Sequence, residues 1–122
     1  MKIIKSLQNQ NLGKTCIFDE IDTGIGGSIG VVVAKQMSEI SKNNQVLCIT
    51  HLAQIACFAD NMLKISKYED NGKTYTSVKR LLNEEITQEI TRLIGTNEVS
   101  EFAYRHAEEL IKEAIEYKKS FN

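Results

Sequence analysis

Apolar residues follow two different spacings along the chain, and the order of these spacings predicts an α/β fold. Short continuous apolar runs at residues 15–18 and 46–49 are typical of buried parallel strands. After each run, apolar residues recur every three or four positions, as they do on one face of a helix. Two successive strand–helix units predict a mostly parallel sheet with flanking helices.

The helices of this first half carry recognisable start and stop signals. Ser28 is placed to cap a helix that ends before Asn43-Asn44. The expected buried face of this helix comprises Ile29, Val33, Met37 and Ile40. A short helix is expected over residues 52–58, and residues 1–9 have the spacing of a helix tail.

The second half of the chain predicts a β-hairpin followed by two helices. Strand-like residues 62–65 and 74–78 flank Asn71-Gly72, a dipeptide favoured in two-residue hairpin turns. Asn83 is expected to cap the next helix and Gly95 to end it. The expected buried face of that helix is Ile86, Ile90, Leu93 and Ile94. The last helix is expected to bury Val99, Phe102, Ala103, Leu110, Ile111 and Ala114.

Composition narrows the classes of partner. The 122 residues are 42% hydrophobic and 25% charged. The net charge of -1 shows that the chain lacks the excess of basic residues typical of a DNA-binding domain. The apolar runs are far shorter than the roughly 20 residues that span a bilayer, so no membrane contact is expected. Cys16, Cys48 and Cys57 are widely spaced, which predicts buried reduced thiols in a cytoplasmic protein rather than a zinc site.

Polar residues with catalytic potential follow both predicted strands. Asp19-Glu20 comes directly after the first strand and Thr50-His51 after the second. Ligands of parallel sheets collect at the carboxyl ends of strands. There, one acid can hold Mg²⁺ through water, a second can polarise a water that attacks a phosphate, and a histidine can donate to a phosphate oxygen. Solvated acids and a structural histidine are the alternative, and His106 is expected to be structural.

A glycine-rich loop extends the acid pair. Asp22 is a further acid in residues 21–27, and Gly24 opens a run of glycines that permits close backbone approach. By contrast, the tripeptide at residues 13–15, Gly-Lys-Thr, is not expected to cradle phosphate. A phosphate loop needs a glycine where Gln8 stands, and it must lead into a helix rather than a strand.

Two segments together resemble a known family. Residues 17–27, Ile-Phe-Asp-Glu-Ile-Asp-Thr-Gly-Ile-Gly-Gly, and residues 49–56, Ile-Thr-His-Leu-Ala-Gln-Ile-Ala, resemble the RecN family of bacterial DNA-repair proteins. These are relatives of the SMC proteins with an ATP-binding-cassette head. The resemblance is close over residues 15–60 and looser over residues 61–118. It implies the C-terminal lobe of an α/β P-loop NTPase head, with the hairpin and two terminal helices.

The resemblance also implies roles for single residues. Asp19 resembles the Walker B acid that binds Mg²⁺, Glu20 the catalytic base, and His51 the histidine that senses the γ-phosphate of ATP. Asp19, Asp22 and Gly24 are the expected cofactor-binding residues, with Asp22 on the D-loop that faces a partner head. The implied partners are the second head of a homodimer and DNA, in a nucleoid-associated parent protein.

The phosphate-binding Walker A loop and the cassette signature are not found in the sequence. Residues 1–122 are therefore expected to form a single partial domain that needs the N-terminal lobe of the same head. Alone, the chain is not expected to bind ATP tightly or to hydrolyse it. Two other classes stay open: a non-catalytic interaction module, and a phospho-acceptor receiver domain. The second is disfavoured because the strand after the acid pair ends in Thr50-His51.

Overall fold

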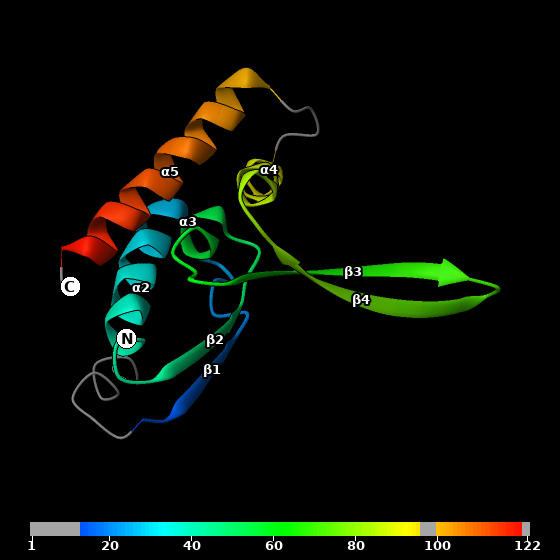
Figure 1. The fold of residues 1–122 in the computed structure, drawn as a ribbon, viewed down its shortest axis with the longest axis horizontal. Helices are drawn as coiled ribbons and strands as arrows, with labels where there is room; N and C mark the ends of the chain where they lie inside the picture. The colour runs from blue at the N-terminus through cyan, green and yellow to red at the C-terminus, as the bar shows by residue number, and fades with distance from the viewer. Residues whose placement is uncertain (1–12, 96–99, 121–122) are drawn as a thin grey trace.

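A computed structural model of the chain describes residues 13–95 and 100–120, so the expected helix over residues 1–9 and the expected burial of Val99 lie outside the described residues. The elements in chain order are β1 (Thr15–Asp19), α2 (Gly27–Ile40), β2 (Gln45–Ile49), α3 (Ala53–Ala56), β3 (Met62–Asp70), β4 (Lys73–Leu81), α4 (Glu84–Leu93) and α5 (Glu101–Lys119) (Figure 1). This order confirms the predicted α/β pattern, hairpin and terminal helices.

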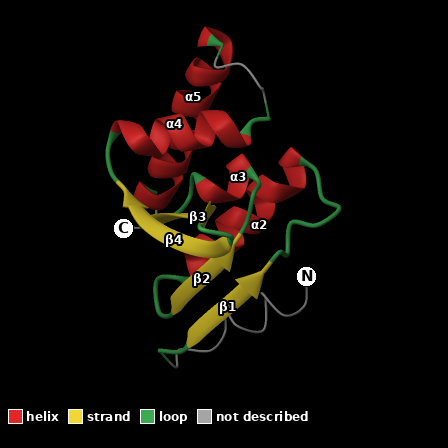
Figure 2. Cartoon of the chain, turned by 90° about the vertical axis from the view of Figure 1, so that its right-hand side faces the viewer, coloured by secondary structure: helices red, strands yellow, loops and turns green. Residues whose placement is uncertain are grey.

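The strands β1 and β2 form a parallel pair that fixes the position of the candidate site. Thr15 pairs with Gln45 at one end and Asp19 with Ile49 at the other. The backbone N–H of Glu20 donates to the Ile49 carbonyl at 3.0 Å, one residue beyond the strand. Figure 2 shows both strands ending at the same edge, with the helices gathered on one side of the pair.

The parallel pair is covered on one face only, where the sequence predicts fully buried strands. Cys16 and Phe18 are buried in a cluster with α2. On the other face Ile17, Leu47 and Ile49 are 68%, 47% and 48% exposed, and no described element packs over them. A continuous apolar run indicates two covered faces, but the described residues supply a cover for one.

Helix α2 begins one residue before the predicted cap. The N–H of Gly30 donates to the Gly26 carbonyl at 2.9 Å, which makes Gly26 the N-cap and leaves Ser28 exposed within the first turn. Of the predicted face, Val33, Met37 and Ile40 are buried, whereas Ile29 is 54% exposed. The buried face is displaced because the small residue Gly30 packs against the segment after β2.

The hairpin of β3 and β4 turns at the predicted dipeptide and is longer than predicted. Asn71 and Gly72 have φ of 50° and 75°, the left-handed conformation that a two-residue turn requires, and Asp70 pairs with Lys73 across it. Figure 1 shows the hairpin projecting away from the helices. Its outer half is polar, so apolar spacing underestimates its length.

Helices α4 and α5 pack together over α3. Gly95, at φ +91°, ends α4 as predicted. Asn83 occupies the N-cap position of α4 but makes no side-chain cap bond, because its own φ of 53° departs from the extended conformation of a capping residue. Ser100 does cap α5, where its hydroxyl accepts from the Ala103 N–H at 3.1 Å.

The buried face of α5 is built mainly from small residues. Leu110 is buried along with Ala103, Ala107 and Ala114. Phe102 is 81% exposed, so its predicted burial is wrong. It lies in the first turn and one residue, or about 100° of helix rotation, away from Ala103 on the buried face.

The three cysteines are free; Cys16 and Cys57 are buried as predicted, whereas Cys48 is only half-buried. Burial raises the pKa of Cys57 to about 12 and that of Cys48 to about 11. Both thiols are therefore protonated at neutral pH and are poor nucleophiles. No helix in the described part of the chain has the length and apolar character needed to cross a membrane.

A buried carboxylate joins α4 to the hairpin. Glu89 is 8% exposed and pairs with Lys64 of β3 at 3.1 Å and with Arg92 at 2.5 Å. Burial alone would raise the pKa of the Glu89 carboxyl, but hydrogen bonds from Arg92 and Lys64 hold it below its ordinary value. Its contribution to stability is thus present above the pKa of the unfolded chain and is lost as the pH falls through the folded value.

We expect Glu89→Gln to lower the free energy of unfolding at pH 7 by about 1–3 kcal/mol, because two cations lose a charged partner. The variant should also lose less stability than the parent between about pH 5 and pH 3. Urea denaturation across this pH range measures both effects. Glu101→Gln, which alters an exposed pair with Arg105, is the matched control and should cost less than about 1 kcal/mol. Equal losses in the two variants would contradict the prediction.

Candidate functional site

The ends of β1 and β2 bring three exposed polar side chains to one edge. Asp19 is the last residue of β1, Glu20 follows it, and His51 comes two residues after β2. The acids are exposed, and the side chain of His51 is 75% exposed. Because Asp19 pairs with Ile49 and Glu20 bonds to it, the edge is common to all three residues.

Glu20 has an unusual backbone conformation. Its φ of 51° lies in the left-handed region, which costs a residue other than glycine about 1–3 kcal/mol. The conformation is fixed on both sides, since the Glu20 N–H donates to Ile49 and the Glu20 carbonyl accepts from the Thr23 hydroxyl at 3.0 Å. Strained backbone conformations of this kind are common at functional sites, so the conformation supports the prediction of a catalytic role for Glu20.

Asp22 connects the loop after β1 to the loop after β2. Its Oδ2 accepts from the Thr50 hydroxyl at 2.6 Å and from the His51 backbone N–H at 3.1 Å. Burial alone would raise the pKa of the Asp22 carboxyl, but these hydrogen bonds hold it below its ordinary value. The carboxylate is therefore charged at neutral pH and lies inside the chain. Direct contact of Asp22 with a nucleotide stays a prediction.

The imidazole of His51 is left open to a ligand. Its Nδ1 is 3.9 Å from Asp22 Oδ2, which is within the range of an ion pair but too far for a hydrogen bond. Asp22 thus hydrogen-bonds the backbone of His51, while the ring makes only the longer electrostatic contact. Thr50, to which sequence reasoning gave no separate role, supplies the other contact. A hydroxyl residue next to a histidine at a strand end is the only signal that pointed to it.

The glycines of the loop have two different roles. Gly24 has φ +77° and open space around it, so it is required by the backbone rather than by close approach. Close approach occurs instead at Gly27, where a Cβ would lie 2.9 Å from the Gln54 side chain. At Gly30 a Cβ would lie 2.5 Å from Leu52 Cδ2. Gln54 and Leu52 therefore pack the segment after His51 against α2, a role that the sequence analysis did not assign.

Gly30→Val is expected to lower the free energy of unfolding by about 1–3 kcal/mol, because a side chain there must displace Leu52. Denaturation in urea, followed by far-ultraviolet circular dichroism, measures the loss. The matched control is Ser28→Val, at an exposed position of the same helix, which should stay within about 0.5 kcal/mol of the parent. A comparable loss at Ser28 would mean that the helix, and not the close contact, determines the cost.

The tripeptide Gly-Lys-Thr is placed as the sequence predicts. The Lys14 N–H donates to the Asn44 side chain at 2.9 Å, and Thr15 begins β1 with no helix between. The described residues also contain no cluster of three or more histidine, cysteine or acidic side chains that could hold a metal. Mg²⁺ in a phosphate site needs only one or two carboxylates besides the phosphates, and the exposed Asp19 fits that requirement.

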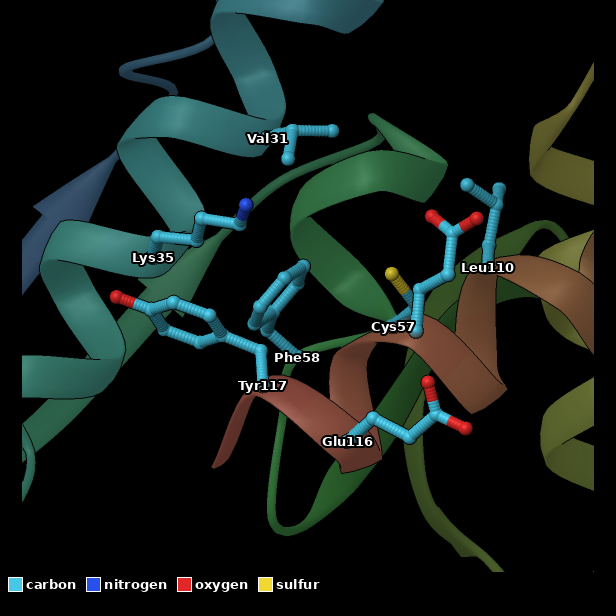
Figure 3. A pocket seen from close by; sticks show the side chains of 8 residues that line it. Val31, Lys35, Cys57, Phe58, Leu110, Glu116 and Tyr117 are labelled. Carbon is cyan, nitrogen blue, oxygen red and sulfur yellow. The ribbon is translucent and has the colours of Figure 1, made fainter. Parts of the chain in front are cut away.

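A separate cleft of about 310 Å³ lies between α2, α3 and α5 (Figure 3). Tyr117 lies beside it with its hydroxyl donating to Glu39 at 2.9 Å, Lys35 lies 5.0 Å from the Tyr117 ring centroid, and Phe58 meets that ring edge-on. None of the predicted site residues lines this cleft. At this cleft Tyr117 of α5 contacts Lys35 and Glu39 of α2. The cleft is distinct from the strand-end edge.

Comparison with known proteins agrees with this arrangement. The chain is 43% identical to the DNA repair protein RecN of Bacillus subtilis over 97% of its own length and 21% of that protein. It is also 43% identical to RecN of Deinococcus radiodurans, over 78% of its length and 17% of that protein. The chain thus spans about a fifth of the length of these curated relatives. No family model matches it.

A solved structure has the same fold. It comes from work on the structural biochemistry of ATP-driven dimerization and DNA-stimulated activation of SMC ATPases, and superposes with a TM-score of 0.56 at 23% identity. The match covers 69% of this chain and 50% of that one, so it concerns the fold of an SMC ATPase head. The sequence identities, and not the structural match, show that this chain corresponds to the C-terminal part of the RecN proteins.

Proposed function

We propose that this chain supplies the hydrolytic half of an ATP site in a RecN-type DNA-repair ATPase. The observation that carries the proposal is the common edge of Asp19, Glu20 and His51, with the loops behind it joined by Asp22. In the proposed site Asp19 holds Mg²⁺, which would offset charge on the phosphates of bound ATP. The His51 imidazole donates a hydrogen bond to an oxygen of the γ-phosphate.

Glu20 acts as the base in the proposed reaction. Its carboxylate orients a water molecule whose oxygen bonds to the γ-phosphorus as the bond to the β–γ bridging oxygen breaks. The water proton passes to Glu20, and the products are ADP and inorganic phosphate. The exposure of Glu20 and its fixed backbone support this role, because the side chain can reach a ligand without a movement of the loop backbone.

The phosphate-cradling half of the site is proposed to come from the preceding lobe of the same head. The exposed apolar face of Ile17, Leu47 and Ile49 supports a covering element there, because apolar patches on a sheet are normally packed. The proposed parent pairs with a second head around ATP and acts on DNA. The DNA contact is assigned to other parts of the parent, since this chain has a net charge of -1.

The test is a chimera in which this chain replaces the matching segment of Bacillus subtilis RecN. We expect the chimera to bind and hydrolyse ATP, and the 122-residue chain alone to bind ATP only weakly in a calorimetric titration. Tight binding by the chain alone would contradict a partial site. A folded chimera that binds ATP without hydrolysing it would instead support the non-catalytic interaction module.

A further inference from the structure

Packing alone does not account for the hydrogen bonds of the buried Asp22 carboxylate. Its side chain is fully buried, yet Oδ2 takes both hydrogen bonds and Oδ1 has no partner among the described residues. A buried charge is costly unless hydrogen bonds or an opposite charge compensate for its lost hydration. Here both donors, Thr50 and His51, belong to one short segment that follows the neighbouring strand.

The contacts continue beyond Asp22. The Thr50 hydroxyl that donates to Asp22 also accepts from the Leu52 N–H at 3.0 Å. One oxygen of Asp22 therefore accepts from two donors of the same turn, the Thr50 hydroxyl and the His51 N–H. The Leu52 N–H is linked to Asp22 indirectly, through the Thr50 hydroxyl. On the other side, the Ile25 N–H donates to the Asp22 carbonyl, and the Thr23 N–H donates to Glu20. The carboxylate thus joins a turn that carries Glu20 to a turn that carries His51.

From this geometry we infer that Asp22 is a positioning residue. Its carboxylate sets the relative placement of Glu20 and His51 through Thr50 and the backbone of His51, and the imidazole stays exposed toward the phosphate. The catalytic purpose of this placement rests on the proposed function, whereas the placement itself follows from contacts within this chain. It assigns Thr50 as the partner through which Asp22 acts.

The test uses the 122-residue chain and the hydrogen-exchange rates of single amides, measured by NMR. Asp22→Ala should speed exchange of the His51 amide by roughly tenfold or more, because the bond to a charged acceptor is lost. Thr50→Val should speed exchange of the Leu52 amide, and Thr50→Ser, which keeps the hydroxyl, should restore the parent rate. The Ile90 and Ala107 amides, in the core cluster of α4 and α5, should be accelerated in every variant by much less than the amide that loses its bond.

Asp22→Asn provides the same reading if Asp22→Ala fails to fold. It keeps an acceptor oxygen and the side-chain shape but loses the negative charge, so the His51 amide should exchange faster than in the parent. Where both variants fold, the acceleration should be smaller than in Asp22→Ala. Unchanged exchange at His51 in folded variants would overturn the inference. So would equal acceleration at His51 and Ile90, which would mean a general loss of stability. None of these measurements requires ATP, so they are independent of whether the chimera hydrolyses it.

Discussion

Replacing Glu20 by glutamine in the RecN chimera is expected to reduce ATP turnover by at least about 100-fold while the affinity for ATP stays within about threefold. Glutamine has the shape of glutamate and leaves the loop backbone unchanged, but its amide cannot accept the proton of the attacking water. The phosphate contacts are proposed to lie in the preceding lobe, so binding is largely independent of Glu20. Steady-state release of phosphate and a separate nucleotide titration measure the two quantities.

The backbone of Glu20 makes glutamine the appropriate replacement. At φ 51° an alanine would change the cost of the left-handed conformation and the solvation of the loop together. Glu109→Gln, an identical charge change on the exposed side of α5, is the matched control and should keep full turnover. If Glu20→Gln hydrolyses ATP at the parent rate, Glu20 is not the base and the proposed mechanism fails.

The features that sequence alone predicts correctly are set by local chemistry. The Asn71-Gly72 turn follows from two residues that accept positive φ, whatever the rest of the chain does. The strand-end edge follows from apolar runs that stop at polar residues, because parallel strands end together. The sequence therefore predicts that Asp19, Glu20 and His51 lie at one edge of the sheet.

The features that sequence misses depend on contacts between distant segments. Asp22 and Thr50 are 28 residues apart, and nothing in either segment indicates that one accepts from the other. Ile29 and Phe102 have the spacing of buried residues, but which side of a helix is covered depends on the neighbour that packs there. The Asn83 prediction fails for a related reason: the turn after β4 sets its φ and moves the side chain out of capping geometry.

The largest stability effect is expected for Ile90→Ala. Ile90 is fully buried in a cluster that includes Ala53 of α3, Cys57 at the end of that helix, and Ala107 and Leu110 of α5. Removing its side chain leaves a cavity between three helices, at a cost of about 2–5 kcal/mol. The midpoint of thermal unfolding should then fall by roughly 10 °C or more. Ile29→Ala, at an exposed position of α2, is the control and should cost less than about 1 kcal/mol.

Helix α3 determines how that loss spreads through the chain. Ala53 belongs to the cluster of α4 and α5, whereas Ile55 belongs to the cluster of β1 and α2. Since one short helix is shared by both clusters and begins two residues after His51, loss of packing at Ile90 should also loosen the site segment. We therefore expect Ile90→Ala to unfold in a single transition, seen equally by circular dichroism and by tyrosine fluorescence. Two separate transitions would mean that the strand-end site is stable without α4 and α5, and that α3 does not couple them.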